Sequence, residues 1–308
     1  MTRARRVRPG DRVAVVAPSS PFTAEDLQAG LDEIRRLGFE PVHDDRLFAR
    51  RGYVAGEAGV RAGALMDALA DPSVACVLTA RGGFGSVQLL PLLDPAAIRD
   101  ARRLIVGYSD LTSLLSFVTG QCGLAAAHGP SVASRLGGGA AWYDEASFLA
   151  VLTSEAPLGE LQPGELEVFR GGEARGPLFG GNLTQLAASL GTPYAFDPPA
   201  GSLLLVEDVN ERPYRLERAW TQLRLGGVIA RVSGIVFADF PGCDEPGGAV
   251  TARAVLGDLV RDFAGPVVFG LRTGHTRGPA LTVPLGVGAR VVAGARPALV
   301  IEESAVGE

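Results

Sequence analysis

The sequence predicts an α/β protein, with a mainly parallel sheet in its first half and a mixed, β-rich second half. Short apolar runs alternate with segments of helical spacing as far as Phe117, which is typical of a parallel sheet covered by helices on both faces. Beyond Pro279 the chain changes to short β runs separated by Gly and Pro turns. At 308 residues, of which 47% are hydrophobic, the chain is long enough for two domains.

Strands and helices are expected to alternate through the first half. Thr23 is a candidate N-cap of the first helix, and Gly38 provides its end. Between them apolar residues recur at helical spacing. The expected strands are residues 12–17, 39–42, 75–79 and 104–106, and the expected helices are residues 24–37, 57–70 and 86–93.

The alternating pattern is lost around residues 135–176, where glycine pairs and triplets indicate a connection. We therefore expect an α/β domain over residues 1–150, a linker over residues 151–175 and a β-rich domain over residues 176–308. In this second domain, expected helices are residues 181–190, 216–225 and 252–263. Expected strands are residues 202–206, 234–240, 267–271, 281–283, 289–292 and 298–301.

Charge and composition exclude several function classes. The net charge is −5 and the arginines are dispersed, which argues against a nucleic-acid partner. The chain has no lysine, which excludes a Walker-A lysine and a Schiff-base lysine. Its three histidines and three cysteines show no metal-binding spacing, so neither a metal nor a cofactor is expected. No run of about 18 apolar residues occurs, and the apolar stretch after the basic N-terminus is too short for a signal peptide. We expect a cytoplasmic protein without a membrane partner.

The stretch Gly107-Tyr-Ser109-Asp110 has the pattern of a nucleophile elbow. An apolar run ends in Gly107, a serine follows, and a helical pattern begins at once, so that a sharp turn would expose the serine Oγ. The G-x-S-x-G pattern is incomplete, because Leu111 stands where the second glycine would be. Ser109 could also be a plain helix N-cap, because serine is a favoured capping residue.

A serine nucleophile needs a base and a carboxylate that orients the base. His275 lies in a glycine-flanked loop after an expected strand, and His128 is the rival base. Glu207 and Asp208 follow an apolar run and are candidates for the carboxylate. Charged residues at the end of a buried strand are, however, also expected for solubility alone. The order Ser…Glu…His occurs in known hydrolases.

The segment Arg81-Gly-Gly-Phe-Gly-Ser86 does not fit a phosphate-binding loop, because the glycine spacing fails and no lysine follows. Its adjacent glycines could instead point backbone N–H groups toward an oxyanion. Around this loop and the strand ends, the candidates for substrate binding are Arg81, Phe84, His128 and Asn182.

These motifs together resemble the LD-carboxypeptidases and the related microcin C immunity peptidases, which are serine peptidases with a Ser-Glu-His triad. The matching motifs occur in order over nearly the whole chain. They are Val15-Val-Ala-Pro-Ser-Ser20, Arg81-Gly-Gly-Phe-Gly85, Gly107-Tyr-Ser-Asp110, His128-Gly-Pro130, Gly180-Gly-Asn-Leu183, Val206-Glu-Asp-Val-Asn-Glu211, Gly234-Ile-Val-Phe237, Gly274-His275 and Pro284-Leu-Gly286.

The resemblance implies Ser109 as nucleophile, His275 as base and Glu207 as its partner, with an oxyanion hole formed by backbone N–H groups at Gly83 and Asp110. It also implies a flavodoxin-like N-terminal domain, a β-rich C-terminal domain and a homodimer. The implied function is removal of the terminal D-alanine from murein tetrapeptides during cell-wall recycling. Two alternatives remain open: an immunity peptidase that cleaves an aminoacyl-nucleotide antibiotic, and a non-catalytic binder of small molecules.

Overall fold

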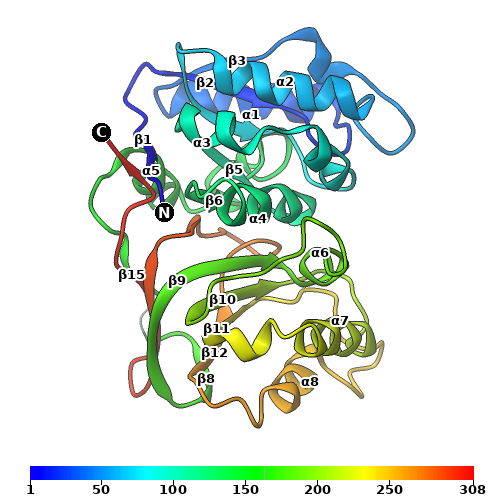
Figure 1. Cartoon of the computed structure of the whole chain (residues 1–308), viewed down its shortest axis with the longest axis vertical. Coiled ribbons are helices and arrows are strands. Elements are labelled where there is room, and N and C mark those ends of the chain that lie inside the picture. The colour runs from blue at the N-terminus through cyan, green and yellow to red at the C-terminus, as the bar shows by residue number, and fades with distance from the viewer. Residues whose placement is uncertain (163) are drawn as a thin grey trace.

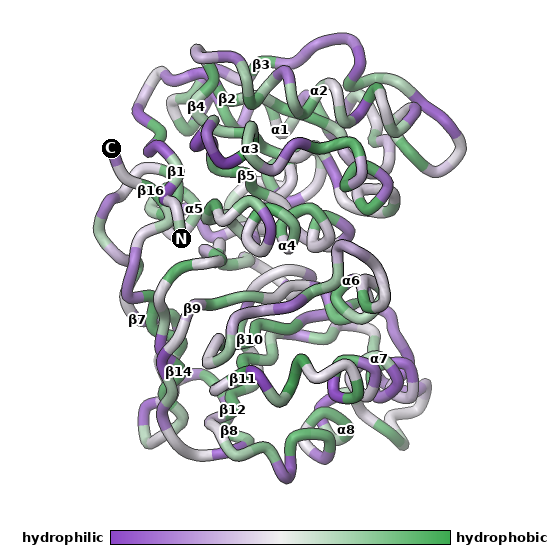
Figure 2. Tube along the Cα trace, viewed as in Figure 1, coloured by the Kyte–Doolittle hydropathy of each residue, from purple (hydrophilic) through white to green (hydrophobic). Residues whose placement is uncertain are grey.

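The computed structural model describes residues 1–162 and 164–308. Two parts follow each other along the longest axis of the molecule (Figure 1). Each part is built around its own sheet, of six strands in the N-terminal part and eight in the C-terminal part. Hydrophobic residues follow central strands such as β10 and β11, whereas α7 carries many hydrophilic ones (Figure 2).

The N-terminal sheet has the strand order β13-β6-β5-β4-β2-β3. Its first five strands in the sequence are all parallel, and β13 joins the edge antiparallel to β6. Without β13, the order along the chain is 2-1-3-4-5, which confirms the expected flavodoxin-like arrangement. The strands are β2 (Arg12–Val16), β3 (Glu40–Val42), β4 (Val74–Thr79), β5 (Leu104–Gly107), β6 (Ala126–His128) and β13 (Val283–Leu285).

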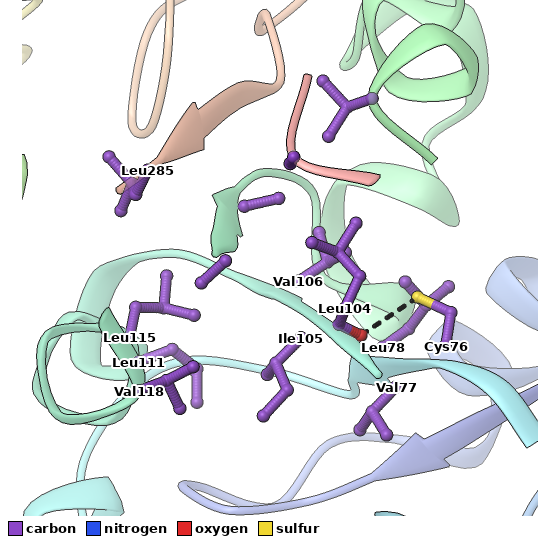
Figure 3. Packing of buried hydrophobic residues seen from close by; sticks show 14 of the residues in the cluster. Cys76, Val77, Leu78, Leu104, Ile105, Val106, Leu111, Leu115, Val118 and Leu285 are labelled. Carbon is purple, nitrogen blue, oxygen red and sulfur yellow. Dashed lines mark hydrogen bonds between the residues drawn. The ribbon is translucent and has the colours of Figure 1, made fainter. Parts of the chain in front are cut away.

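Helices pack against this sheet, and the apolar runs of the sequence fill the space between the layers. All six residues of β4 are buried, as expected for a central parallel strand covered on both faces. Figure 3 shows Leu111, Leu115 and Val118 in one packed cluster with residues of β4 and β5. The helices are α1 (Ala24–Arg36), α2 (Ala58–Ala70), α3 (Pro95–Ala101), α4 (Thr112–Gly120) and α5 (Glu145–Thr153). Thr23 caps α1 as predicted, since its hydroxyl accepts a hydrogen bond from the Asp26 N–H.

The C-terminal sheet has the order β7-β15-β14-β9-β10-β11-β12-β8. Its centre, from β9 to β12, is parallel, and the other strands are antiparallel. The strands are β7 (Gly159–Leu161), β8 (Glu167–Arg170), β9 (Gly172–Asn182), β10 (Ser202–Glu207), β11 (Val232–Ala238), β12 (Val267–Leu271), β14 (Gly288–Ala293) and β15 (Ala298–Ile301). Trp220 and Phe237 lie in an aromatic-rich core between the sheet and three helices. These helices are α6 (Leu183–Ala188), α7 (Pro213–Leu225) and α8 (Ala252–Leu259).

The structure differs from the sequence prediction in how segments are shared between the two parts. The expected linker over residues 151–175 contains β7, β8 and the start of β9, and two of its glycines, Gly159 and Gly172, are the first residues of strands. The strand expected at residues 281–283 is β13, at Val283–Leu285, and it belongs to the N-terminal sheet. Near the termini, β1 (Ala4–Arg5) pairs with β16 (Val306–Gly307). The chain therefore returns to the N-terminal part after building the C-terminal sheet.

Within the described residues, no helix is both long enough and apolar enough to cross a membrane.

Candidate active site

The candidate residues gather where strand ends of the two parts meet. Ser109 follows β5, Glu207 ends β10, and His275 lies in the loop after β12. The carboxyl ends of parallel strands are where α/β sheets build their sites. The two parts touch here: α4 of the N-terminal part contacts β9 and α6 of the C-terminal part. One direct link is the hydrogen bond from the Asn182 N–H to the Thr112 hydroxyl, at 2.9 Å.

Ser109 has the backbone conformation of a nucleophile elbow. Its φ is 65°, in the left-handed region that non-glycine residues rarely adopt, and such a conformation costs about 1–3 kcal/mol. It begins a short 3₁₀ turn, Ser109–Leu111, that leads into α4, and its side chain is partly exposed. The extended N-cap of this turn is Tyr108, so Ser109 does not take the capping position that the sequence left open.

Glycines on either side of the serine turn allow neighbouring segments to approach the turn closely. A Cβ on Gly107 would lie 2.6 Å from the Thr79 hydroxyl, and a Cβ on Gly82 would lie 2.9 Å from the Ser109 Cβ. Real side chains do not approach so closely. The glycine loop and the serine turn are therefore packed directly against each other.

His275 and Glu207 form a tight pair. The His275 Nδ1 lies 2.6 Å from the Glu207 Oε2, and the backbone N–H of His275 donates to the same oxygen at 3.2 Å. Gly274 has a φ of 63°, and a Cβ there would lie 2.8 Å from the Glu207 carboxylate. The pair therefore requires a glycine next to the histidine.

The electrostatics of this pair keep Glu207 ionised. Its side chain is fully buried, and burial raises its pKa, but the neighbouring His275 and its hydrogen bonds hold the pKa below the usual range. An ionised Glu207 accepts a hydrogen bond from Nδ1–H of His275. That bond fixes the tautomer in which Nε2 is free to take a proton.

Tyr108 connects the two halves of the candidate site. Its ring packs edge-on against the His275 ring, with 5.0 Å between the centroids. Because Tyr108 precedes Ser109 directly, this contact brings the serine turn and the histidine loop together. The sequence reasoning missed Tyr108, although its place between Gly107 and Ser109 was visible.

The rival histidines differ from His275 in burial and in their partners, although His128 also packs edge-on against the Tyr108 ring. His128 ends β6 and is fully buried, and burial lowers its pKa to about 4. Among the described residues, neither of its ring nitrogens has a hydrogen-bond partner. His43 is exposed and packs against Phe48. Of the three histidines, His275 alone is both partly exposed and paired with a carboxylate in the described part of the chain.

We expect the His275→Gln variant to lose the acidic limb of the rate profile, and the His128→Gln variant to keep it. A base must be neutral to accept a proton, so protonation of the base at low pH lowers the rate. Burial lowers the pKa of His128 to about 4, so His128 is already neutral above that pH and should not produce the limb. The measurement is kcat/KM against pH for both variants. Loss of the limb in His128→Gln, with its survival in His275→Gln, would reverse the assignment.

Asp208 and Glu211, the neighbouring carboxylates, have other partners. Asp208 is buried and accepts hydrogen bonds from the Asn182 amide at 2.9 Å and from the Thr184 N–H at 3.0 Å. Burial raises its pKa. Glu211 pairs with Arg215 at 3.4 Å. Of these three carboxylates, Glu207 is therefore the one that pairs with a histidine.

Asn182, a sequence candidate for substrate binding, is buried between the two parts. Its side-chain oxygen caps α6 by accepting from the Gln185 N–H, and its amide donates to Asp208. Both ends of this side chain are thus engaged in holding the strand end. By contrast, Arg81 and Phe84 are exposed near the serine turn.

The glycine loop that carries Gly83 is held on several sides. Gly83 has a φ of 103°, and a Cβ there would lie 2.4 Å from the Ser20 hydroxyl. The Ser20 hydroxyl accepts from the Phe84 N–H at 3.0 Å. The Asp110 carboxylate accepts from the Ser86 N–H at 2.8 Å, so the serine turn and this loop are tied together.

A buried arginine also supports this loop. The guanidinium of Arg61 donates to the carbonyl oxygens of Gly85 at 2.9 Å, of Gly56 at 3.0 Å and of Pro18. Those carbonyls belong to three different loops. No local pattern indicates this role, because Arg61 lies in an ordinary helical pattern.

Ser109 is strained and partly exposed, and the adjacent Tyr108 packs against a histidine that is paired with a carboxylate. This arrangement is suited to acyl transfer. The fold and site define a two-part, serine-type hydrolase. Residues 13–129 match the LD-carboxypeptidase N-terminal domain, and residues 175–291 match the LD-carboxypeptidase C-terminal domain. The chain belongs to the LD-carboxypeptidase family, as the sequence motifs predicted.

Two relatives extend this result. The chain is 38% identical to a putative carboxypeptidase of Streptomyces coelicolor, over 94% of this chain and 93% of the relative. It is 36% identical to the murein tetrapeptide carboxypeptidase of Pseudomonas aeruginosa, over 86% of this chain and 88% of the relative. A solved structure of the microcin C7 self-immunity protein MccF superposes with a TM-score of 0.90 at 24% identity, over the full length of both chains. That last likeness shows a shared fold.

Proposed function

We propose that this protein is a serine carboxypeptidase that hydrolyses the amide before the terminal D-alanine of murein tetrapeptides, in cell-wall recycling. The observation that carries the proposal is the pairing of His275 with the buried Glu207 at 2.6 Å, next to a serine turn with left-handed geometry. The relative in Pseudomonas aeruginosa, named a murein tetrapeptide carboxypeptidase, supports the choice of substrate.

In the proposed reaction, the Ser109 Oγ attacks the carbonyl carbon of the amide while the His275 Nε2 takes its proton. Backbone N–H groups of Gly83 and Asp110 stabilise the oxyanion that forms. His275 then gives its proton to the amine of D-alanine, which leaves. A water molecule, activated by the same histidine, hydrolyses the acyl-enzyme. Glu207 stabilises the imidazolium at each step without taking the proton.

The test of this proposal is release of D-alanine from purified murein tetrapeptide, with an aminoacyl sulfamoyl adenosine assayed in parallel. We expect D-alanine to be released at a much higher kcat/KM than the amino acid of the nucleotide analogue. The reverse preference would instead make the protein an immunity-type peptidase. If neither compound turned over while both bound equally well to wild type and Ser109→Ala, the non-catalytic binder would be correct.

We expect metal chelators to leave activity unchanged. In the described ranges, no group of three or more His, Cys, Asp or Glu side chains lies close enough to hold a metal ion, and the proposed steps are completed by side chains and backbone. The measurement is D-alanine release after dialysis against EDTA. Inactivation that zinc restores would overturn this expectation.

The proposal includes a cytoplasmic, homodimeric enzyme with a peptide or peptide-like substrate. These features come from the composition and the family resemblance. Light scattering on the purified protein tests the dimer.

A further inference from the structure

The loop that carries His275 is fastened at its base by contacts to both ends of the loop. Thr273 and Leu281 form a bridge, and the Thr273 hydroxyl donates to the Leu281 carbonyl at 2.7 Å. Thr276 donates its hydroxyl to Asp239, which directly follows β11. The Thr276 contact comes from the same part of the chain as Glu207, whereas Leu281 leads two residues later into β13 of the N-terminal sheet. These contacts hold the two ends of the loop, and a further residue holds the carbonyls just after His275.

Arg135, from the N-terminal part, reaches this loop. It lies in the short helical turn Val132–Leu136, and its side chain is buried. One guanidinium nitrogen donates to the Thr276 carbonyl at 2.6 Å, and the other donates to the Gly278 carbonyl at 3.1 Å. The planar fork of an arginine thus holds two carbonyls just after His275.

The same guanidinium contacts the serine side of the site. Its central carbon lies 5.7 Å from the centre of the Tyr108 ring, close enough for a cation–π contact. Tyr108 precedes Ser109 and packs against the His275 ring. The Arg135 guanidinium also donates to the Trp142 carbonyl at 2.6 Å, in a segment that pairs with the loop through Ala280. Arg135 therefore touches the serine turn, the histidine loop and the connection between them.

We propose that Arg135 is a positioning residue that sets His275 relative to Ser109 across the interface of the two parts. It does not contact the reacting atoms. It acts through the carbonyls of Thr276 and Gly278 and through the Tyr108 ring. The inference rests on the proposed Ser109–His275 chemistry.

The test compares Arg135→Lys and Arg135→Ala with wild type. A lysine keeps the charge but cannot hold both carbonyls in a planar fork. A misplacement of catalytic groups by about 1 Å can cost on the order of a hundredfold in rate. We expect kcat for D-alanine release to fall by about that factor in both variants, with KM little changed. Millimolar guanidinium should partly restore Arg135→Ala by filling the vacated site.

A stability control separates positioning from simple loosening of the fold. Leu256→Ala removes a buried side chain of α8, in the C-terminal core away from the histidine loop. We expect it to lower the melting temperature and to leave kcat unchanged below that temperature. An unchanged kcat in both Arg135 variants would overturn the proposal. The proposal would also be overturned if Leu256→Ala lost kcat to the same extent as the Arg135 variants. It would likewise fail if guanidinium did not restore any kcat to Arg135→Ala.

A second readout keeps this proposal distinct from the choice of substrate. The rate at which a small fluorophosphonate labels Ser109 depends on the base, not on murein recognition. If wild type is labelled but releases no D-alanine, the proposed substrate is wrong, and the Arg135 variants should still be labelled about a hundredfold more slowly. If wild type is not labelled at Ser109, both the proposed chemistry and the role of Arg135 fail.

Discussion

Ser109→Ala is expected to lower kcat by several orders of magnitude while the protein remains folded. The change removes the attacking Oγ, and loss of a triad serine generally leaves only the small acceleration provided by binding and the oxyanion hole. The fold should be unaffected, because alanine keeps the Cβ for which Gly82 leaves room. The measurement is D-alanine release under saturating tetrapeptide.

Ser113→Ala is the matched control for that experiment. Ser113 lies one turn further along, in α4, and its hydroxyl donates to the Gln185 side chain at 3.1 Å. We expect this variant to keep nearly full activity. If Ser113→Ala were inactive and Ser109→Ala active, the nucleophile would be misplaced in our account.

Glu207→Gln is expected to reduce turnover on the order of a thousandfold or more, with substrate binding preserved. An amide nitrogen facing the His275 Nδ1 donates where the carboxylate accepted, which favours the tautomer with its proton on Nε2. That tautomer cannot take the serine proton. The effect should appear in kcat and not in substrate affinity, which is measured by calorimetry on the Ser109→Ala background.

Glu211→Gln provides the comparison for the carboxylate. Glu211 pairs with Arg215, so its amide variant should keep most activity. Should Glu211→Gln be the impaired variant and Glu207→Gln the active one, the acid that orients His275 would lie in the turn after β10 and not in the strand.

The elements predicted best from the sequence are those buried on both faces. In β4 and β10 every residue is buried, so an uninterrupted apolar run shows the strand without any tertiary information. The long strand β9 was missed because its first half, Gly172–Pro177, is polar and glycine-containing. It is a strand because β14 pairs with it. Pairing with a distant segment leaves no local signal.

The residues of the candidate site divide in the same way, into those with a local sequence signal and those whose role depends on distant segments. Ser109, Glu207 and His275 carried local signals, namely a strand-to-helix serine, a charge at a strand end and a glycine-flanked loop. The roles of Arg135 and Asp208 depend on which segments fold together. The bond from Arg135 to the Thr276 carbonyl joins residues 141 positions apart, and nothing in either segment indicates the other.

The most direct test of the central claim, that Ser109 is the nucleophile activated by the His275–Glu207 pair, is peptide mapping of the protein after reaction with a fluorophosphonate. We expect one adduct, on Ser109, that forms much more slowly in Glu207→Gln and is absent in Ser109→Ala. An adduct on another residue, or labelling of Ser109→Ala at the wild-type rate, would contradict it.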